Sequence, residues 1–429
     1  MSDAPLFLGI DVGTSGVRAC VIDGDGRELA TQATATAPPN RPAAAESEQL
    51  AEPWWEAVRS VVRNLPESAR ARITALAFDA TSGSLIRTDA VGAPLGPALM
   101  YNDARATAEA AWIGRVAPPA SGAHGASAGL AKLLWLMRQR PDPACRHALH
   151  QADWLLGRCT GQWGHSDWNN ALKLGFDPVE QIWPAWLDRL GVPRDWLPRV
   201  NAPGTALAPL APAAARDLTL DPRVVACHGT TDSIAAFIAT GADRVGDAVT
   251  SLGSTLALKL LTDRPVFAPE YGIYSHRLGT RWLVGGASNS GGAVLQQYFT
   301  DAEIADLSAQ IDPEHATALD YYPLPGTGER FPFADPDRAS RIAPVPADRA
   351  VFLHGLLEGI ARIEQTGYAR LAELGAPYPT RVLSVGGGAR NSSWTRIRAR
   401  LLGCEVGPAL HQQAAYGAAL LARAGGHAA

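Results

Sequence analysis

A short segment near the N-terminus has the residue types that hold a phosphate group. Asp11-Val12-Gly13-Thr14-Ser15 lies between two apolar runs. Gly13 lets backbone N–H groups approach phosphate oxygens closely, and the hydroxyls of Thr14 and Ser15 are further donors. Asp11 has the carboxylate that Mg²⁺ binds together with phosphates and waters. A plain hairpin turn has the same composition, and the P-loop spacing GxxxxGK(S/T) is absent from the chain, so both interpretations stay open.

A second carboxylate, Asp232, has the position expected of a general base. We expect a strand over residues 223–227, a polar turn after it, and an apolar helix that begins near Asp232. A carboxylate there can cap the N–H groups of the first helical turn. It can also accept the proton of a hydroxyl that attacks a phosphorus. His228, in the same turn, is an acid or base by type, although a packed structural histidine fits the position better.

Two glycine-rich segments in the second half of the chain can complete a nucleotide site. Ser251-Leu252-Gly253-Ser254-Thr255 repeats the strand–turn–strand pattern and predicts a second phosphate-binding turn, or a turn alone. Val385-Gly386-Gly387-Gly388 leads from a strand into a helix, and its glycines leave room for a flat group against the backbone. Asn391 can cap that helix or hydrogen-bond a nucleoside. The segment lacks the GxGxxG form of a dinucleotide site.

The elements that must position these residues follow an α/β pattern. Strands over residues 6–10, 17–22 and 27–34 predict an antiparallel meander, and the return of the strand–turn–strand pattern at 248–260 indicates an internal duplication. Residues 104–222, rich in Pro and Trp, are expected to form short helices and loops that shape a pocket wall. Further elements are expected near residues 54–65 (helix), 73–78 (strand), 351–374 (helix), 381–385 (strand), up to 402 (helix) and 412–424 (helix).

Composition places the chain among ordinary soluble proteins. It has 429 residues, of which 47% are hydrophobic and 19% charged, and a formal net charge of -4. This charge provides no basic field for nucleic acid or an anionic membrane. The five cysteines form no CxxC pair, which argues against a disulfide framework and a structural zinc site and fits a reducing compartment. Without a signal-peptide pattern or a run of ~20 apolar residues, the expected location is the cytoplasm.

The order of the chemical segments is more informative than any one of them. The segments follow the order found in actin-like ATPases and sugar kinases. This order is a phosphate hairpin, a strand–Asp–helix segment, a second phosphate hairpin and a strand–Gly-Gly-Gly–helix segment. The whole chain resembles the FGGY family of carbohydrate kinases, from Leu8-Gly9-Ile10-Asp11-Val12-Gly13-Thr14-Ser15 to Ala415-Tyr416-Gly417-Ala418-Ala419. It looks closest to a short subgroup described as D-ribulose kinases in cyanobacteria and plants. The segments that carry this resemblance are Gln151-Ala152-Asp153-Trp154, Asn170-Ala171-Leu172-Lys173-Leu174-Gly175, Gly229-Thr230-Thr231-Asp232-Ser233, Asp320-Tyr321-Tyr322-Pro323-Leu324-Pro325, Gly328-Glu329-Arg330-Phe331-Pro332 and His354-Gly355-Leu356-Leu357-Glu358-Gly359.

The resemblance implies an α/β fold of two ribonuclease-H-like domains, of the actin and hexokinase type, with ATP in the cleft between them. Residues 1–240 are then the sugar-binding and catalytic domain, to which a helix at 412–429 returns, and residues 241–411 are the nucleotide-binding domain. ATP and Mg²⁺ are the implied cofactors and a sugar is the implied partner. Neither nucleic acid nor a membrane is implied, and a homodimer is left open.

The resemblance also assigns roles to individual residues by their place in the matched motifs. Asp232 matches the catalytic base. The positions implied for the sugar are Asp11, Ser82, Asp232 and Ser233, and Asp11 also matches the magnesium position. The positions implied for ATP are Gly13, Thr14, Ser15, Gly253, Ser254, Thr255, Gly387, Gly388, Asn391 and Trp394.

The implied reaction is phosphorylation of D-ribulose to D-ribulose 5-phosphate by Mg-ATP, with Asp232 as general base. Many family members have a Gln-Met-His-Gly-like segment where this chain has Asp79-Ala80-Thr81-Ser82-Gly83-Ser84-Leu85, and most are longer. Both differences argue against xylulose and glycerol as acceptors. A xylulokinase, or another pentulose or polyol kinase of the family, is an alternative. An actin-like ATPase without a sugar acceptor is an alternative of another class, although no residues are left over for a peptide-binding domain.

Overall fold

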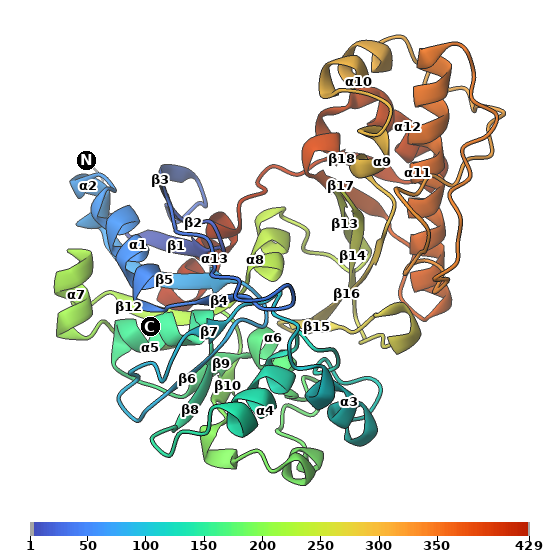
Figure 1. The fold of residues 1–429 in the computed structure, drawn as a ribbon. Helices are drawn as coiled ribbons and strands as arrows, with labels where there is room; N and C mark the ends of the chain where they lie inside the picture. The colour runs from blue at the N-terminus through green and yellow to red at the C-terminus, as the bar shows by residue number, and fades with distance from the viewer. Residues whose placement is uncertain (1–3, 428–429) are drawn as a thin grey trace. The chain divides into compact units, whose positions relative to one another are not determined.

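A computed structural model of the chain describes residues 4–427. These residues form two compact units, one of residues 4–239 with 413–427 and one of residues 240–412. Each unit is built around its own mixed sheet (Figure 1). The boundary expected from the sequence lies one residue from this division. The end of the expected C-terminal segment, residues 428–429, and the start of the first expected domain, residues 1–3, lie outside the described residues.

The sheet of the first unit has six strands, of which the central three run parallel. β1 pairs with β5 and β5 with β12 in parallel, whereas β2, β3 and β11 continue the sheet in antiparallel fashion. The predicted meander is therefore confirmed in β1, β2 and β3. The strands, in their order across the sheet, are β11 (Ala206–Pro209), β12 (Val225–Thr231), β5 (Ile73–Ala80), β1 (Leu6–Val12), β2 (Gly16–Ile22) and β3 (Glu28–Ala35).

Alternation along β1 gives this sheet two apolar faces. Leu6, Leu8 and Ile10 join a core with α1 (Glu52–Arg63), α5 (Gln151–Thr160) and α7 (Pro212–Leu218), while Phe7 packs on the other face with α13 (Ala414–Gly426). A Cβ at Gly9 would lie 1.9 Å from the Ala415 carbonyl oxygen, so only glycine lets α13 rest on the strand. Asp11 is on the same face as Gly9 because side chains alternate.

The expectation of short helices and loops for residues 104–222 is only partly correct. α3 (Thr107–Val116) and α4 (Gly129–Gln139) are regular helices that share a separate apolar core with a small four-stranded sheet. Leu85 and Leu99 of that sheet pack with Leu130 and Leu133, which gives this region a core of its own. The small sheet has the order β4 (Glu48–Gln49), β7 (Ala98–Leu99), β6 (Leu85–Thr88) and β8 (His147–His150). Further short elements are α2 (Glu67–Arg70), β9 (His165–Asp167), α6 (Trp168–Ala171), β10 (Arg199–Asn201) and the 3₁₀ turns Leu172–Leu174, Ala185–Leu190 and Arg194–Trp196.

The second unit repeats the strand order of the first. An antiparallel meander, β13–β14–β16, is extended on the side of its first strand by two parallel strands, β17 and β18, as β1–β2–β3 is extended by β5 and β12. This shared topology confirms the predicted internal duplication. The order is β15 (His276–Leu278), β16 (Arg281–Ser288), β14 (Leu256–Thr262), β13 (Asp247–Leu252), β17 (Arg381–Val385) and β18 (Glu405–Pro408).

The helices of the second unit pack around a single apolar core. The 25-residue α11 (Arg349–Glu373) begins at Asp348, whose side chain accepts the amides of Ala350 and Val351. The other helices are α9 (Gly292–Leu295), α10 (Asp301–Ser308), α12 (Ser392–Leu402) and the 3₁₀ turns Pro269–Tyr271 and Gly387–Arg390. Among residues 4–427, no helix has both the length and the apolarity that a bilayer span requires.

Candidate active site

The carboxyl ends of the three parallel strands of the first unit bring polar side chains together. Asp11 of β1 lies opposite Asp79 of β5, and Asp79 lies opposite Thr230 of β12. Because parallel strands end at the same edge, these residues form a row across the sheet. α8 (Asp232–Ala239) begins directly after β12, so Asp232 is at this edge as well. The edge is where ligands bind in open α/β sheets.

Asp79 is a fully buried carboxyl group next to Asp11. Burial raises the pKa of Asp79 well above its usual range, and the charges of Asp11 and Asp232 raise it further. Burial also raises the pKa of Asp11, against the opposing effects of a hydrogen bond with Asp79 and the charge of Arg18. Neither oxygen of Asp79 has an N–H or O–H donor among the described residues. Burial and the two neighbouring charges therefore favour the neutral, protonated form of Asp79, which can donate to an acceptor such as the Asp11 carboxylate.

Asp232 is the first residue of its helix, and the strand before it is longer than predicted. The expected polar turn at residues 228–231 is wrong, because β12 continues to Thr231, which pairs with Ala80 of β5. A Cβ at Gly229 would lie 1.9 Å from the Phe78 carbonyl oxygen, so glycine allows this close pairing. The Asp232 carboxylate accepts the amide of Ser233 at 2.6 Å. The position places the carboxylate next to the N–H groups at the start of α8.

His228 has the structural role that the sequence favoured. Its side chain is 1% exposed, and its ring lies 5.8 Å from that of His165. Burial lowers the pKa of His228 to about 4, and the neighbouring His165 adds to this effect. The imidazole is therefore neutral at pH 7 and packs beneath the edge rather than acting there.

Ser82 lies in the turn that directly follows β5. Thr81 is fixed by the side chain of Gln151, whose Oε1 accepts a hydrogen bond from the Thr81 hydroxyl at 2.7 Å. The hydroxyls of Thr81 and Ser84 are joined by a hydrogen bond of 2.6 Å. Ser82 lies between these anchored residues, and its Oγ is buried without a partner among the described residues. The turn thus holds a hydroxyl ready for a polar ligand.

Several buried polar atoms at this edge, those of Asp79 and Ser82 among them, have no hydrogen-bond partner among residues 4–427. Buried polar groups are usually hydrogen-bonded, so a cluster of exceptions points to a ligand that supplies the missing bonds. Asn169 belongs to the cluster because its Nδ2 donates to Thr230 at 3.1 Å while its Oδ1 is unpartnered. The unpartnered atoms are Asp79 Oδ1 and Oδ2, Ser82 Oγ, Gln151 Nε2, Asn169 Oδ1 and Thr231 Oγ1.

The first glycine turn presents two hydroxyl residues at the end of β1. The amide of Gly13 is used within the turn, where it donates to the Gly16 carbonyl at 3.0 Å. Thr14 is half-buried and Ser15 is exposed, so their donors are accessible. Arg18, opposite Asp11 in the β1–β2 ladder, approaches its carboxylate with Nη1 at 3.4 Å.

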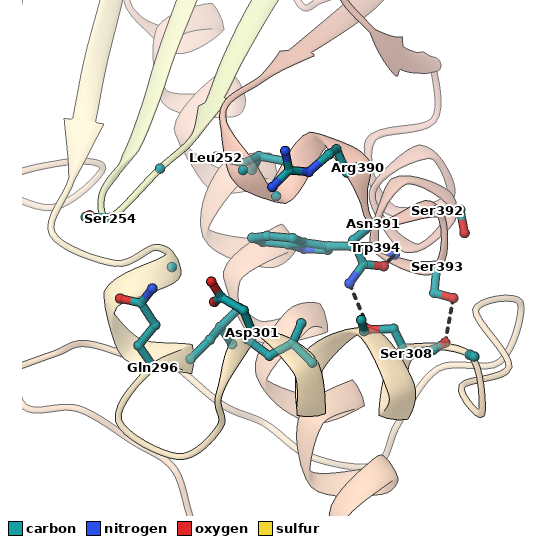
Figure 2. A pocket seen from close by; sticks show the side chains of 18 residues that line it. Leu252, Ser254, Gln296, Asp301, Ser308, Arg390, Asn391, Ser392, Ser393 and Trp394 are labelled. Atoms are coloured by element: carbon teal, nitrogen blue, oxygen red, sulfur yellow. Dashed lines mark hydrogen bonds between the residues drawn. The ribbon is translucent and has the colours of Figure 1, made fainter.

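In the second unit, most residues expected to bind ATP line one cavity of about 520 Å³ (Figure 2). The turn after β13 contributes Gly253 and Ser254 from one side, and the segment between β17 and α12 contributes the glycines from another. Thr255 is exposed and is not among the lining residues. The expected residues that line the cavity are Gly253, Ser254, Gly387, Gly388, Asn391 and Trp394.

Asn391 and Trp394 shape this cavity through their contacts with protein. Asn391 caps α12, since its Oδ1 accepts the Trp394 amide at 2.9 Å, and its Nδ2 donates to Ser308 Oγ at 2.8 Å. Figure 2 shows this bond and the parallel one from Ser393 to Ser308. Trp394 is 2% exposed and donates through Nε1 to the Leu357 carbonyl. Both side chains thus form the wall of the cavity, and α10 is tied to α12 by Ser308.

The cavity also contains polar residues that the sequence did not single out. Arg390 is exposed at the end of the 3₁₀ turn Gly387–Arg390, and Asp301 begins α10; Figure 2 shows the two around the indole of Trp394. Arg390 could have been suspected from its place directly after the glycine segment. Asp301 and Ser308 have no such signal, because α10 lies far from that segment in the sequence.

Comparison with known proteins places the chain in a family. The model of the N-terminal domain of the FGGY family of carbohydrate kinases matches residues 6–239, and the model of its C-terminal domain matches residues 248–425. The chain belongs to the FGGY family of carbohydrate kinases. It is therefore a sugar kinase whose phosphate donor is ATP, and the expected actin- and hexokinase-like fold is confirmed by its structural neighbours.

FGGY relatives with different sugars resemble the chain to similar degrees. Xylulose kinase of Escherichia coli (strain K12) is 26% identical over 94% of this chain and 88% of the relative. Gluconokinase of Bacillus subtilis (strain 168) is 23% identical over 97% of this chain and 86% of the relative. The crystal structure of a xyloylose kinase from Brucella ovis, 25% identical, has a TM-score of 0.87 and covers 99% of this chain and 91% of its own. These names differ in their sugar, so they leave the acceptor of this kinase open.

Proposed function

We propose that this kinase transfers the γ-phosphate of ATP to a ketopentose, and that its acceptor is D-ribulose, which becomes D-ribulose 5-phosphate. The observation that carries the proposal is the cluster of buried, unpartnered polar atoms at the carboxyl edge of β1, β5 and β12. A small polyhydroxylated molecule has the alternating donors and acceptors that such a cluster needs. The segment Asp79–Gly83, which lacks the Met and His of many family members, favours ribulose over xylulose.

Asp232 is the proposed general base. Its carboxylate takes the proton of the terminal sugar hydroxyl as that oxygen attacks the γ-phosphorus, and the bond from phosphorus to the β–γ bridging oxygen breaks. Asp11, Ser82 and Ser233 are proposed to orient the sugar. Their contribution is positioning, which supplies a large part of the rate in phosphoryl transfer.

Three glycine-rich segments are proposed for the nucleotide. In the second unit, Gly387 and Gly388 leave the cavity wall free of side chains, which suits a flat purine, and Asn391 and Trp394 hold the wall in place. Gly253, Ser254 and Thr255 are proposed for the phosphates. In the first unit, Gly13, Thr14 and Ser15 are proposed for the phosphates as well.

Asp11 also fits Mg²⁺. Its carboxylate lies at the carboxyl end of β1, with the exposed Arg18 as its cationic partner at 3.4 Å. A single carboxylate of this kind suits a hard cation that keeps waters and phosphate oxygens as its other ligands. Held by Asp11, Mg²⁺ would supply positive charge next to the β- and γ-phosphates.

The test is ADP release by the purified protein with Mg-ATP over a panel of sugars. D-ribulose and D-xylulose differ only in the configuration at C3, so the pair isolates recognition of one hydroxyl. We expect saturable stimulation by D-ribulose and at least ~10-fold lower kcat/KM for D-xylulose and glycerol, as expected when a buried polar group loses its partner. A preference for D-xylulose would keep the kinase and replace its acceptor. ATP turnover that no sugar stimulates would favour the actin-like ATPase.

A further inference from the structure

Lys132, in α4, is a fully buried lysine that contacts the turn carrying Ser82. Its side chain is 0% exposed, and its ammonium donates to two backbone carbonyls, that of Gly83 at 2.8 Å and that of Met100 at 2.6 Å. A buried charge costs several kcal/mol unless its surroundings compensate. Burial lowers the pKa of Lys132 to about 7, against the opposing charge of Asp103 and with the help of Lys173 and Arg105. The protein tolerates this cost next to the turn that we propose for the sugar.

The rest of the chain shows that a lysine at this place is unusual. Of the 38 lysines and arginines, only three are lysines: Lys132, Lys173 and Lys259. A guanidinium is planar and presents its donors in a rigid fork, whereas an ammonium is compact and can sit between two carbonyls. Lys173 lies beside the same turn, since a Cβ built on Gly83 would be 4.0 Å from its Cγ. Two of the three lysines therefore adjoin Gly83.

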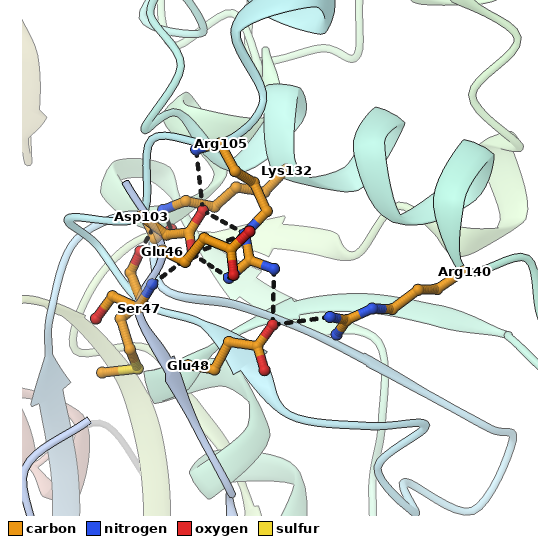
Figure 3. A network of polar contacts seen from close by, with 9 residues as sticks. Glu46, Ser47, Glu48, Asp103, Arg105, Lys132 and Arg140 are labelled. Atoms are coloured by element: carbon orange, nitrogen blue, oxygen red, sulfur yellow. Dashed lines mark hydrogen bonds and ion pairs between the residues drawn. The ribbon is translucent and has the colours of Figure 1, made fainter. Parts of the chain in front are cut away.

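One of the two carbonyls that Lys132 joins is firmly held. The amide of Met100 donates to Ser47, and its carbonyl also accepts the amide of Asp103 at 2.9 Å. Asp103 is in turn fixed by Arg105, whose Nη2 lies 2.7 Å from its Oδ2 (Figure 3). Arg105 continues to Glu48 at 2.7 Å, and Arg140 binds the same Glu48 oxygen at 2.9 Å. Met100 is thus an anchor in a network of ion pairs.

The other carbonyl belongs to a turn that needs such an anchor. Gly83 has a φ of 85°, in the left-handed region, and the Ser82 hydroxyl before it makes no bond that would hold it. Thr81 and Ser84 fix the two ends of the turn, through Gln151 and through the Tyr101 amide, which donates to Ser84 Oγ at 2.9 Å. Lys132 holds the residue between them.

We infer that Lys132 is a positioning residue for the sugar, which ties the turn carrying Ser82 to the Met100 anchor and so fixes the Ser82 hydroxyl. The inference rests on the proposed role of Ser82 in binding the acceptor. Lys132 touches no substrate itself, and it acts through the turn. Its removal should therefore weaken sugar binding and leave the nucleotide site of the second unit as it is.

The first test is the kinetics of Lys132→Met, a substitution of similar length without the donors. We expect the KM of the sugar to rise about ten-fold, while the KM of ATP changes less than about two-fold. Arg140→Met is the matched control, because it removes a cation of the same network that does not contact the turn; its sugar KM should stay near that of the wild type. An unchanged sugar KM in folded Lys132→Met, or equal rises for sugar and ATP, would overturn the inference.

A double-mutant cycle with Ser82→Ala separates positioning from general loss of structure. If Lys132 acts through Ser82, adding Lys132→Met to Ser82→Ala should raise the sugar KM less than about two-fold further. Independent, multiplicative effects would contradict the proposed route.

A measurement on the wild type covers the case in which Lys132→Met does not fold. With only three lysines, ¹³Cε-lysine labelling gives three side-chain signals, and Lys173→Met and Lys259→Met identify that of Lys132 by elimination. We expect this signal to shift when the sugar saturates the protein and to stay unchanged with a non-hydrolysable ATP analogue alone. A Lys132 signal that does not respond to a sugar the enzyme phosphorylates would overturn the inference but not the function. A wild type that phosphorylates no sugar would overturn both.

Discussion

Asp11 and Asp79 face each other across the parallel β1–β5 ladder, and burial favours the neutral, protonated form of Asp79 beside the Asp11 carboxylate. Asp79 is buried from solvent. It pairs with Asp11 of β1 on one side and with Thr230 of β12 on the other. The pair therefore sets the position and charge of the carboxylate that we propose for the sugar and Mg²⁺.

The form in which Asp79 acts can be tested with two substitutions. Asp79→Asn keeps a donor for Asp11, so we expect kcat to fall less than ~10-fold. Asp79→Ala removes the donor and leaves the exposed Arg18 as the partner of Asp11, so we expect a loss of about 100-fold, as for other preorganised donors at reaction centres. The measurement is kcat at saturating ATP and sugar, with thermal melting to confirm the fold. Equal, severe losses would show that Asp79 acts as a carboxylate.

Two neighbouring glycines of the second unit should respond differently to alanine. A Cβ at Gly388 would lie 2.5 Å from Trp394 Cζ3 and 2.8 Å from Leu252 Cβ, whereas a Cβ at Gly387 meets nothing within 4 Å. We expect Gly388→Ala to cost about 1–3 kcal/mol of unfolding free energy by overpacking and to raise the KM of ATP. Gly387→Ala, the matched control for stability, should cost less than about 1 kcal/mol. Denaturant unfolding without nucleotide checks both values, and similar losses in the two variants would contradict the packing argument.

Buried His228 should make the protein sensitive to mild acid. Its folded-state pKa, about 4, is below the unfolded value of 6.5, so the unfolded state binds more protons between these values. Its contribution to stability is complete above pH 6.5 and is lost as the pH falls toward 4, by at most about 1.4 kcal/mol per pH unit. In His228→Gln this part of the pH dependence should disappear. His315→Gln, at an exposed histidine paired with Asp312, is the control. Parallel pH curves for His228→Gln and the wild type between pH 4 and 6.5 would contradict the assignment.

The sequence was most informative where a single segment determines the structure. The alternation of Leu6, Leu8 and Ile10 and the glycine turn after them predicted the first meander, because local pattern and turn chemistry agree there. The same agreement predicted the second hairpin, 248–260. The extension of β12 through Thr231 was missed because its polar residues read as a turn. Pairing with β5, a contact across about 150 residues, makes them strand.

The site was predictable only in part, for a similar reason. The residues expected from the sequence stand in glycine-rich turns or at helix starts, where one short segment carries the signal. Gln151, Asn169 and Lys132 reach the edge of the sheet from separate elements, and nothing in their own neighbourhoods indicates it. Asp79 had a local signal, as a charged residue inside a buried strand, but its partner Asp11 is 68 positions away and the pairing appears only in the ladder.

The central claim is that Asp232 removes the proton of a sugar hydroxyl, and the most direct measurement is phosphorylation of D-ribulose by Asp232→Asn beside the wild type. The variant keeps the size of the side chain and removes the base. Asp221→Asn, at an exposed carboxylate of the same unit paired with Arg223, is the matched control. The sugar phosphate formed can be followed by ³¹P NMR, together with ADP release.

We expect kcat of Asp232→Asn to fall by about 10²–10⁴, with a sugar KM within a few-fold of the wild type and Asp221→Asn near wild-type rate. A folded Asp232→Asn protein that forms D-ribulose 5-phosphate at close to the wild-type rate would contradict the account.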